Sequence, residues 1–295
     1  MYAVTGAFGQ TGRIVSQTLL DAGQAVRMIV RRDDAEAAAW RAKGAEVVCS
    51  DVHDLPALTA ALRGAQAAYL LNPPNYMVDD MFAVARQVHG KLVAAANDAG
   101  LPHIVALSSV GAQHEQGTGN ILTTHDFEQQ LAGFKGIRTV LRAANFVENW
   151  AWSIQPVAGQ GILPSMFLPV DKALPMVSAR DIGATVAALL MDNPASNRLI
   201  ALHGPTDVSP ADAATALTHL LRRSVEAVAV PREQWRDIFL SKGFPVTSAD
   251  AFCEMFDGFN SGHIVFDGEL EIRRGSTSLE TALRAVLAAA KAGSA

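Results

Sequence analysis

Short apolar runs alternate with longer amphipathic stretches along the first half of the chain. Six runs are expected to be strands and recur every 20–35 residues or so, at 2–4, 25–30, 45–49, 67–71, 104–107 and 138–141. Most of their residues are apolar, as is typical of strands buried on both faces. Between 79 and 99, apolar residues recur at helical spacing. The alternation predicts a parallel sheet covered on both faces by right-handed crossover helices.

The alternation breaks up after about residue 145. The segment 145–173 carries two Trp and three Pro residues and is expected to form a lobe. Further helices are expected at 178–190, 209–222, 231–241, 248–257 and 278–290, and short strands at 173–177, 198–202 and 225–230. A glycine-rich bend at 257–263 is expected to be a substrate-side loop. The pattern predicts an α/β fold: a Rossmann-type doubly wound parallel sheet of six to seven strands with a smaller, mostly helical α/β C-terminal lobe.

Between the first strand and the first helix lie Gly6, Gly9 and Gly12. Gly6 allows a tight turn, Gly9 lets the backbone approach a phosphate, and Gly12 allows close packing of helix on strand. Free N–H groups at the start of the helix attract the anion. The Gly-x-x-Gly-x-x-Gly spacing favours the short-chain dehydrogenase type of dinucleotide site. Three intervening residues belong to the same predicted cofactor site: Phe8, Gln10 and Thr11.

The glycine motif and the alternation of strands and helices that follows it indicate two domains. Residues 1–150 form the NAD(P)-binding Rossmann domain, to which 174–203 return, and 151–173 and 204–295 form the smaller substrate-side lobe.

Composition removes several other classes of function. A formal charge of −5 and a pI near 5.9 argue against direct binding of nucleic acid. Cys49 and Cys253 form no Cys-x-x-Cys motif, and the eight histidines show no metal-ligand spacing, so no metal site is expected. No signal peptide and no apolar run of about 20 residues is found. We therefore expect a cytoplasmic protein with no membrane contact; whether it forms a homodimer stays open.

The end of the second strand bears on the choice of cofactor. Arg31 stands about 20 residues beyond Gly12, where an arginine would pair with a 2′-phosphate, so NADP(H) is preferred. Asp33 lies two positions further on and keeps NAD(H) open, and Arg31 and Arg32 could also be plain surface residues. After the third strand, Asp51 and Val52 are placed to bracket the adenine.

The turn after the fourth strand, Asn72, Pro73 and Pro74, is expected to line the middle of the cofactor. Like the preceding assignments, this one follows from the position of ligands at the carboxyl ends of parallel strands.

Three segments resemble the NmrA-like family of atypical short-chain dehydrogenases: Thr-Gly-Ala-Phe-Gly-Gln-Thr-Gly-Arg at the start, Leu-Asn-Pro-Pro-Asn at 71–75 and Leu-Arg-Ala-Ala-Asn-Phe-Val-Glu-Asn at 141–149. The resemblance covers most of the chain and includes the bacterial type 2 quinone oxidoreductase and triphenylmethane reductase branch. That group also includes isoflavone-type reductases and non-catalytic sensors of NADP. The resemblance implies the fold and a preference for NADP.

The wider superfamily uses a Tyr-x-x-x-Lys pair for proton transfer, and this chain has no such pair. At the matching place His125 and Gln129 share a helix face, and His125 is the candidate acid, or else a residue that caps the helix or lines the pocket. Gln129 could bind ribose hydroxyls. Ser109, at the end of the fifth strand, is the second catalytic candidate, while Ser108 is either a cofactor contact or part of a simple turn.

Asn145, Phe146 and Asn149 follow the sixth strand and could floor the nicotinamide pocket, although Phe146 fits a core position equally well. The later chain supplies aromatic and soft residues for a substrate site, although residues at helical spacing are more often core than pocket: Trp150, Trp152, Met166, Phe167, Phe244, Phe252, Met255, Phe256 and Phe259.

The leading hypothesis is an NAD(P)H-dependent oxidoreductase that transfers a hydride from NADPH to an electron-poor aromatic acceptor of the quinone, azo or triarylmethane type. The anion formed from a quinone resembles a phenolate, whose pKa is about 10, and tolerates protonation by solvent. Two alternatives remain: a non-catalytic NADP(H) redox sensor that regulates a partner protein, and a natural-product carbonyl reductase that uses His125 as its acid.

Overall fold

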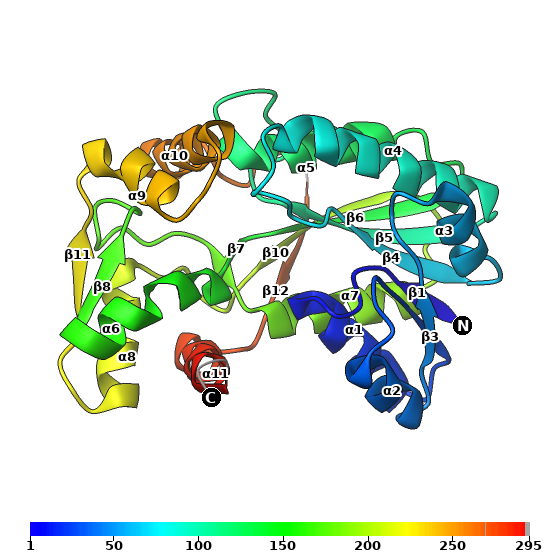
Figure 1. Ribbon diagram of the computed structural model, residues 1–295, viewed down its shortest axis with the longest axis horizontal. Coiled ribbons are helices and arrows are strands. Elements are labelled where there is room, and N and C mark those ends of the chain that lie inside the picture. Colours follow the sequence, from blue (N-terminus) through cyan, green and yellow to red (C-terminus); the bar gives the residue numbers. More distant parts are fainter. Residues whose placement is uncertain (269, 293–295) are drawn as a thin grey trace.

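The computed structural model describes residues 1–268 and 270–292. Its centre is a parallel sheet of eight strands in the order β12-β10-β6-β5-β4-β1-β2-β3 (Figure 1). In chain order these are β1 (Tyr2–Val4), β2 (Val26–Val30), β3 (Glu46–Cys49), β4 (Ala67–Leu71), β5 (His103–Ser109), β6 (Ile137–Ala143), β10 (Arg198–His203) and β12 (Glu271–Arg274). The predicted α/β class and Rossmann-type parallel sheet are confirmed, with eight strands where six to seven were expected.

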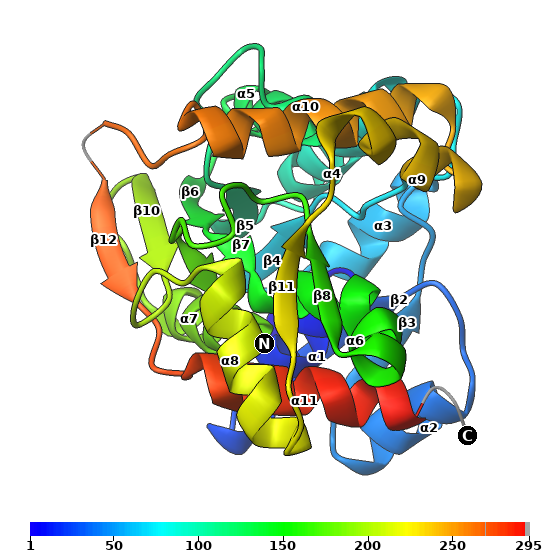
Figure 2. The same ribbon diagram turned by 90° about the vertical axis from the view of Figure 1, so that its left-hand side faces the viewer.

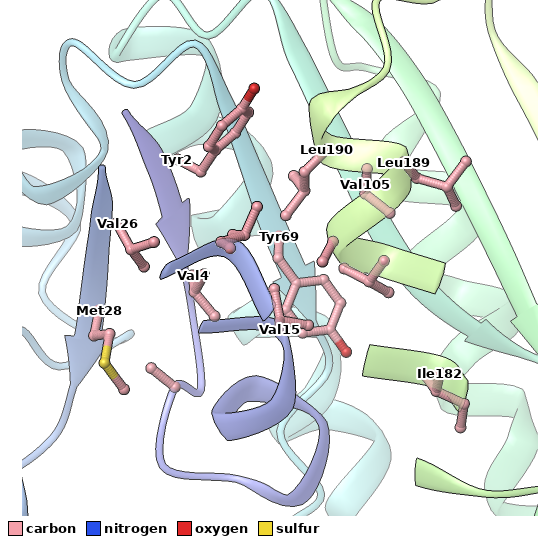
Figure 3. Close-up of a cluster of buried hydrophobic side chains, with 14 of the residues drawn as sticks. Tyr2, Val4, Val15, Val26, Met28, Tyr69, Val105, Ile182, Leu189 and Leu190 are labelled. Atoms are coloured by element: carbon pink, nitrogen blue, oxygen red, sulfur yellow. The ribbon is translucent and has the colours of Figure 1, made fainter. Parts of the chain in front are cut away.

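Helices cover both faces of this sheet (Figure 1). One face carries α1 (Gln10–Asp21), α2 (Ala35–Ala42) and α7 (Ala179–Met191), and the other carries α3 (Leu55–Leu62), α4 (Met81–Asp98) and α5 (Leu122–Leu131). Neighbouring residues of a strand enter opposite cores because side chains alternate across the sheet. Tyr69 packs with α1 and α7, whereas Leu70 packs under α3, α4 and α5. Figure 3 shows the first of these cores, with Val15 and Ile182 near Tyr69.

The sequence pattern explains where these helices lie. The expected stripe of α4 is buried along its whole length, as Met81, Ala85, Val88, Leu92 and Ala96. Asp80 begins α4 by accepting a hydrogen bond from the backbone N–H of Ala83 at 2.9 Å. No helix in the described ranges 1–268 and 270–292 is long and apolar enough to cross a membrane.

A smaller lobe lies beside the sheet (Figure 2). Its elements are β7 (Asn145–Phe146), η2 (Val147–Ser153), α6 (Ile154–Gln160), β8 (Ile162–Ser165), β9 (Met176–Val177), α8 (Pro210–Leu221), β11 (Glu226–Ala229), η3 (Arg232–Gln234), α9 (Trp235–Ser241), α10 (Val246–Ser261) and α11 (Leu279–Ala292). In it β8 pairs with β11 and β7 with β9, both in parallel. One more short helix, η1 (Gly119–Ile121), precedes α5. The chain passes from β6 and from β10 directly into this lobe, so the carboxyl ends of the sheet face it.

Two assignments in the last third of the chain need correction. Within 204–295, expected to belong to the smaller lobe, β12 pairs with β10 and completes the large sheet. The sequence of β12, Glu-Ile-Arg-Arg, does not indicate a strand, because it contains a single apolar residue. That residue, Ile272, is 65% exposed at the edge of the sheet. The predicted bend at 257–263 is mostly helix, since α10 continues to Ser261. Gly258 packs against Ile264 and the carbonyl oxygen of Gly117, so this glycine marks a close approach and not a turn.

Candidate functional site

The glycine loop places the N-terminus of α1 at the carboxyl end of β1. Gly6 has a φ of +58°, which favours glycine, and the N–H of Gly9 donates to the carbonyl oxygen of Gly6 at 2.8 Å. A Cβ on Gly12 would stand 2.3 Å from that same oxygen. No side chain caps α1, and its first turn contains no acidic residue. The free N–H groups and the positive end of the helix dipole therefore suit an anion such as a pyrophosphate.

The residues between the glycines have different environments. Thr11 is buried, and its hydroxyl shares a 2.9 Å hydrogen bond with the phenol of Tyr69. Burial raises the pKa of the Tyr69 phenol far above its usual range, so this ring is a neutral support for the loop. Phe8 packs partly against the core beneath α1, while Gln10 is exposed at the start of the helix. Sequence reasoning missed Tyr69, because its role depends on the pairing of β4 with β1.

The two arginines after β2 differ in their partners. Arg32 pairs with Asp34 and lies 3.6 Å from Glu36, which also binds Arg13 at 2.6 Å. Arg31 is exposed, and among residues 1–268 and 270–292 its side chain has no hydrogen-bond or ion-pair partner. It directly follows Val30, the last residue of the strand next to β1. The guanidinium of Arg31 is therefore free to bind an anionic ligand at this edge of the sheet.

The two aspartates near these arginines are both engaged. Asp33, which kept NADH open, forms a bidentate pair with Arg41 at 2.7 and 2.9 Å, and Arg41 holds its pKa below the usual range. Asp34 caps α2 by accepting from the N–H groups of Glu36 and Ala37. The side chain of Asp33 is thus held by α2 and is not free for a ribose.

Two further predicted contacts follow β3. The carboxylate of Asp51 is exposed and accepts from the backbone N–H of His53 at 2.8 Å. Val52 is half-buried and packs against the core under α3 and α4. This segment is tied to the neighbouring strand, because the N–H of Ser50 donates to the carbonyl oxygen of Val30 at 2.9 Å. Asp51 and Arg31 therefore follow adjacent strands.

The turn after β4 holds Asn72, Pro73 and Pro74. Both prolines are exposed. The side-chain amide of Asn72 donates to the hydroxyl of Thr123 at 3.0 Å, and that hydroxyl donates to the carbonyl oxygen of Asn120 at 2.8 Å. The side-chain oxygen of Asn72 is buried without a hydrogen-bond partner. Thr123 and Asn120 were not predicted, since only the tertiary fold brings the start of α5 to this turn.

Ser108 belongs to a buried polar network at the end of β5. Its hydroxyl donates to Glu128 of α5, and Glu128 accepts from Arg142 of β6 at 2.6 and 2.8 Å. Arg142 also reaches the side-chain oxygen of Gln113 at 3.4 Å. Ser108 and Arg142 lie opposite each other in the paired strands. The network links α5 to the sheet and uses the Ser108 hydroxyl, which supports the structural interpretation of this residue.

The two catalytic candidates, Ser109 and His125, lie at the end of β5 and on α5 respectively. The Ser109 hydroxyl donates to the carbonyl oxygen of Val110 at 3.0 Å. His125 is half-buried, and its Nδ1 lies 2.9 Å from the carbonyl oxygen of Ala112. Because a carbonyl oxygen only accepts, Nδ1 carries the proton and Nε2 is the nitrogen left for chemistry. Gln129, one turn further along α5, is exposed, and no side-chain hydrogen bond is recorded for it.

The segment after β6 carries another orphaned polar group. Asn145 accepts through its side-chain oxygen from Asn149 at 2.9 Å, but its own side-chain nitrogen is buried without a partner. Phe146 is half-buried and packs against the core beneath α1 and α7. In the next turn the Glu148 carboxylate accepts from the N–H of Ala179 at the start of α7, and burial raises its pKa.

The aromatic residues expected to surround a substrate are mainly core. Trp150, Phe167, Phe244 and Phe259 are buried. The partly buried members, Met166, Phe252, Met255 and Phe256, pack against the lobe's two apolar clusters. Trp152 differs from all of these, because it is 56% exposed. Apolar residues at helical spacing on α10 therefore fill the lobe and do not line an open site.

Two of these polar groups lack partners. An acceptor (the oxygen of Asn72) and a donor (the nitrogen of Asn145) are buried and unsatisfied after β4 and β6, whereas buried polar groups usually have a hydrogen-bond partner. The glycine loop leaves no room for side chains where a phosphate would approach. In the described parts of the chain, no group of three or more His, Cys, Asp or Glu residues lies close enough together to hold a metal ion.

Known proteins are similar to this chain in sequence and in fold. Residues 2–283 match the model of the NmrA-like family. An NAD(P)H azoreductase of Xenophilus azovorans is 27% identical over 259 residues, covering 87% of this chain and 86% of that protein.

Two crystal structures of enzymes with bound cofactor have the same fold. The NADPH-dependent quinone oxidoreductase QOR2 of Escherichia coli, complexed with NADPH, gives a TM-score of 0.80 at 24% identity, covering 98% of this chain and 99% of that one. The triphenylmethane reductase of a Citrobacter species, complexed with NADP(H), gives 0.78 at 20% identity, covering 97% and 99%. A further neighbour of this fold holds NAD. Structural neighbours therefore bind NADPH, NADP(H) or NAD.

Proposed function

We propose that this chain, which belongs to the NmrA-like family, is an NADPH-dependent reductase of flat, electron-poor aromatic compounds of the quinone, azo or triarylmethane type. The observation that carries the proposal is the uncapped N-terminus of α1 behind Gly6 and Gly12, beside the unpaired Arg31. A helix N-terminus and a free guanidinium suit a pyrophosphate and a 2′-phosphate respectively. The azoreductase relative supports the reductase class.

The residues after β4 and β6 would hold the reactive end of the cofactor. A carboxamide offers one acceptor and two donors, and the oxygen of Asn72 and the nitrogen of Asn145 are the complementary unsatisfied groups. Bound NADPH supplies the hydride. The chain's own task is to orient this end of the cofactor against the acceptor and to keep the two in contact.

Reduction of a quinone depends little on a protein group that donates a proton. His125 keeps its proton on Nδ1 through the carbonyl oxygen of Ala112, which leaves Nε2 to exchange protons with product or water. The Ser109 hydroxyl is occupied by Val110, so it is a weaker candidate. A hydroquinone anion has a basicity comparable to that of a phenolate, pKa about 10, and it takes its proton from solvent. An alkoxide from a simple ketone needs the acid far more.

Stopped-flow loss of NADPH absorbance across a panel of quinones, azo compounds and triarylmethane dyes tests the proposal. We expect accelerated reduction of at least one of these acceptor classes, and His125→Ala should slow ketone reduction more than quinone reduction. No acceleration over buffer with any acceptor would exclude the reductase. Unchanged ketone reduction in His125→Ala would remove His125 as the acid.

A redox sensor is the second candidate, and Gln129 favours it. The side chain at this position is exposed and uncharged, so it supplies no cation to assist a nearby acid. A sensor should separate NADP⁺ from NADPH in affinity and show no turnover. Calorimetry with NADP⁺, NADPH and NADH distinguishes the two functions, because a reductase has no need for a large difference between the oxidised and reduced forms.

A further inference from the structure

An exposed apolar surface joins three segments that are distant in the sequence. Met77, from the turn after β4, is 57% exposed, Trp152 of η2 is 56% exposed, and Val246 at the start of α10 is 50% exposed. The Met77 methyl group lies 3.6 Å from the position of a Cβ on Gly243. The rings of Trp152 and Phe244 are 5.8 Å apart. We call Met77, Trp152, Lys242, Gly243 and Phe244 the tryptophan platform.

Two residues of the tryptophan platform lie on segments that follow central strands, and the other three connect α9 with α10. Met77 comes five residues after Asn72, and Trp152 comes seven residues after Asn145. The turn after β4 is tied to α10, because the Thr247 hydroxyl donates to the carbonyl oxygen of Asp79 and the ring of Tyr76 lies 4.9 Å from that of Phe252. Ligands of open parallel sheets bind where these carboxyl-end segments converge. An exposed indole there is a flat surface available for stacking.

One residue of the tryptophan platform, Lys242, is a cation that lies over the Trp152 ring. The Nζ atom of Lys242 lies 5.2 Å from the centroid of the Trp152 ring. Among the described residues no ion pair is recorded for Lys242, whereas the nearby Arg232 and Arg236 are neutralised by Asp257 and Asp250. Asp80, near Met77, is occupied as the cap of α4. Lys242 is therefore a cation available to a ligand that covers Trp152.

We infer that the tryptophan platform selects flat aromatic acceptors that carry a negative charge, such as sulfonated or carboxylated quinones and azo compounds. The aromatic face stacks on Trp152 while the anionic group pairs with Lys242. The same lysine disfavours cationic triarylmethane dyes, because a positive ligand over Trp152 meets a like charge. The inference rests on the proposed function for its substrate class, and it narrows that class by charge.

Binding of a molecule that cannot be reduced tests the site apart from turnover. Naphthalene-2-sulfonate and the neutral naphthalene-2-sulfonamide have nearly the same shape and differ in charge. Trp40, Trp150 and Trp235 are buried, so acrylamide quenching of tryptophan fluorescence reports mainly on Trp152. We expect the sulfonate to protect this fluorescence at lower concentration than the sulfonamide. Absence of protection by either compound would overturn the inference.

Variants separate the two parts of the site by calorimetry. Lys242→Gln should weaken binding of the sulfonate by about three- to fivefold, as for an exposed ion pair, and leave binding of the sulfonamide unchanged. Trp152→Ala should weaken binding of both compounds by about tenfold, because stacking does not depend on charge. Lys43→Gln is the matched control: Lys43 lies 4.2 Å over the buried Trp40, on α2, and its loss should affect neither probe. An equal loss for both probes in Lys242→Gln would overturn the role of its charge.

The rates then connect the site with the reaction. A sulfonated naphthoquinone should be reduced with a higher kcat/KM than the unsubstituted quinone, and Lys242→Glu should reverse that order. Reduction of quinones at rates indifferent to Lys242 would overturn the charge selection and leave the proposed function standing. Charge-selective binding with no reduction of any acceptor would support the charge selection and exclude the proposed reductase function.

Discussion

Arg31 and Arg32 are adjacent in the chain and chemically identical, yet they have different surroundings. Arg32 pairs with Asp34 and lies near Glu36, while Arg31 has no ion-pair or hydrogen-bond partner among the described residues. An arginine whose charge is already compensated gains less from a phosphate than one that is free. At the residue scale, the environment of each guanidinium therefore distinguishes two residues that the sequence leaves equivalent.

Replacing Arg31 with alanine should weaken the binding of NADPH by about 10- to 100-fold and change the binding of NADH little. A charge-assisted contact to the 2′-phosphate contributes about 1.5–3 kcal/mol, and NADH lacks that group. Calorimetric titration of both cofactors measures the difference. Arg32→Ala is the control and should shift NADPH affinity much less. Equal weakening of NADPH and NADH in Arg31→Ala would remove Arg31 from the 2′-phosphate.

Several single residues could be placed from the sequence because their chemistry is local. Asp34 directly precedes the Ala-rich helix α2 and is of a residue type that commonly caps a helix, and the positive φ of Gly6 follows from its place in the loop. The unsatisfied oxygen of Asn72 and the partner of Ser108 could not be predicted. Both depend on α5, which reaches the sheet only through tertiary packing.

At the scale of elements, the ion pair between Glu128 and Arg142 joins α5 to β6. Arg142→Met should lower the free energy of unfolding by about 3–5 kcal/mol, because it leaves the buried Glu128 carboxylate without its counter-charge. The double variant Glu128→Leu/Arg142→Met should lose much less than the sum of the single variants. Urea unfolding measures these values.

The exposed pair of Arg236 and Asp250 is the control for this cycle. Arg236→Met should change the free energy of unfolding by less than about 1 kcal/mol, as is usual for surface pairs. If Arg142→Met cost no more than Arg236→Met, the buried pair would not anchor α5.

The contact between the loop after β5 and the segment after α10 should depend on pH. The centroids of the His114 and His263 rings are 4.1 Å apart. The Nε2 atom of His114 accepts a hydrogen bond from the side-chain amide of Gln113. Burial first, and then the nearby His263, lower the pKa of His114 below its usual 6.5. As the pH falls below 6.5, the unfolded chain binds a proton that the folded chain resists, so stability declines.

His114→Gln should therefore reduce the loss of stability between pH 7.5 and 5.5. The difference in bound protons between unfolded and folded chain should fall by up to one in this variant. Urea unfolding at several pH values measures it, with the exposed His219→Gln as control. His89 and His203 also have pKa values lowered by burial, so part of the pH dependence should remain. An unchanged pH dependence in His114→Gln would contradict the assignment.

At the scale of the whole molecule, strands with continuous apolar sequences were predicted to within a few residues. β1, β2, β4, β5, β6 and β10 are mostly of this kind, because burial on both faces favours apolar residues. The edge strand β12 needs few apolar residues and so has no clear signal. Most of the lobe's aromatic residues form its core, whereas Trp152 is exposed. Composition alone does not separate these two uses.

The last helix ties the end of the chain to the lobe. Leu283 of α11 is fully buried in the same apolar cluster as Trp150 and Leu217. Leu283→Ala should lower the free energy of unfolding by about 2–5 kcal/mol, as expected for a cavity in a packed core. Its neighbour Arg284 is exposed, so Arg284→Ala should change that value by less than about 0.5 kcal/mol. Similar small losses in both variants would mean that α11 does not stabilise the lobe.

The position of β12 also has a consequence during synthesis on the ribosome. The glycine loop is synthesised long before the strand that flanks β10, which comes from residues 271–274. Until that segment leaves the exit tunnel, β10 is the outermost strand of the sheet, with one row of its backbone groups unpaired. An apolar strand such as Leu-Ile-Ala-Leu invites pairing with other nascent chains. Premature termination before residue 271 should therefore yield an aggregation-prone product that already contains the complete glycine loop.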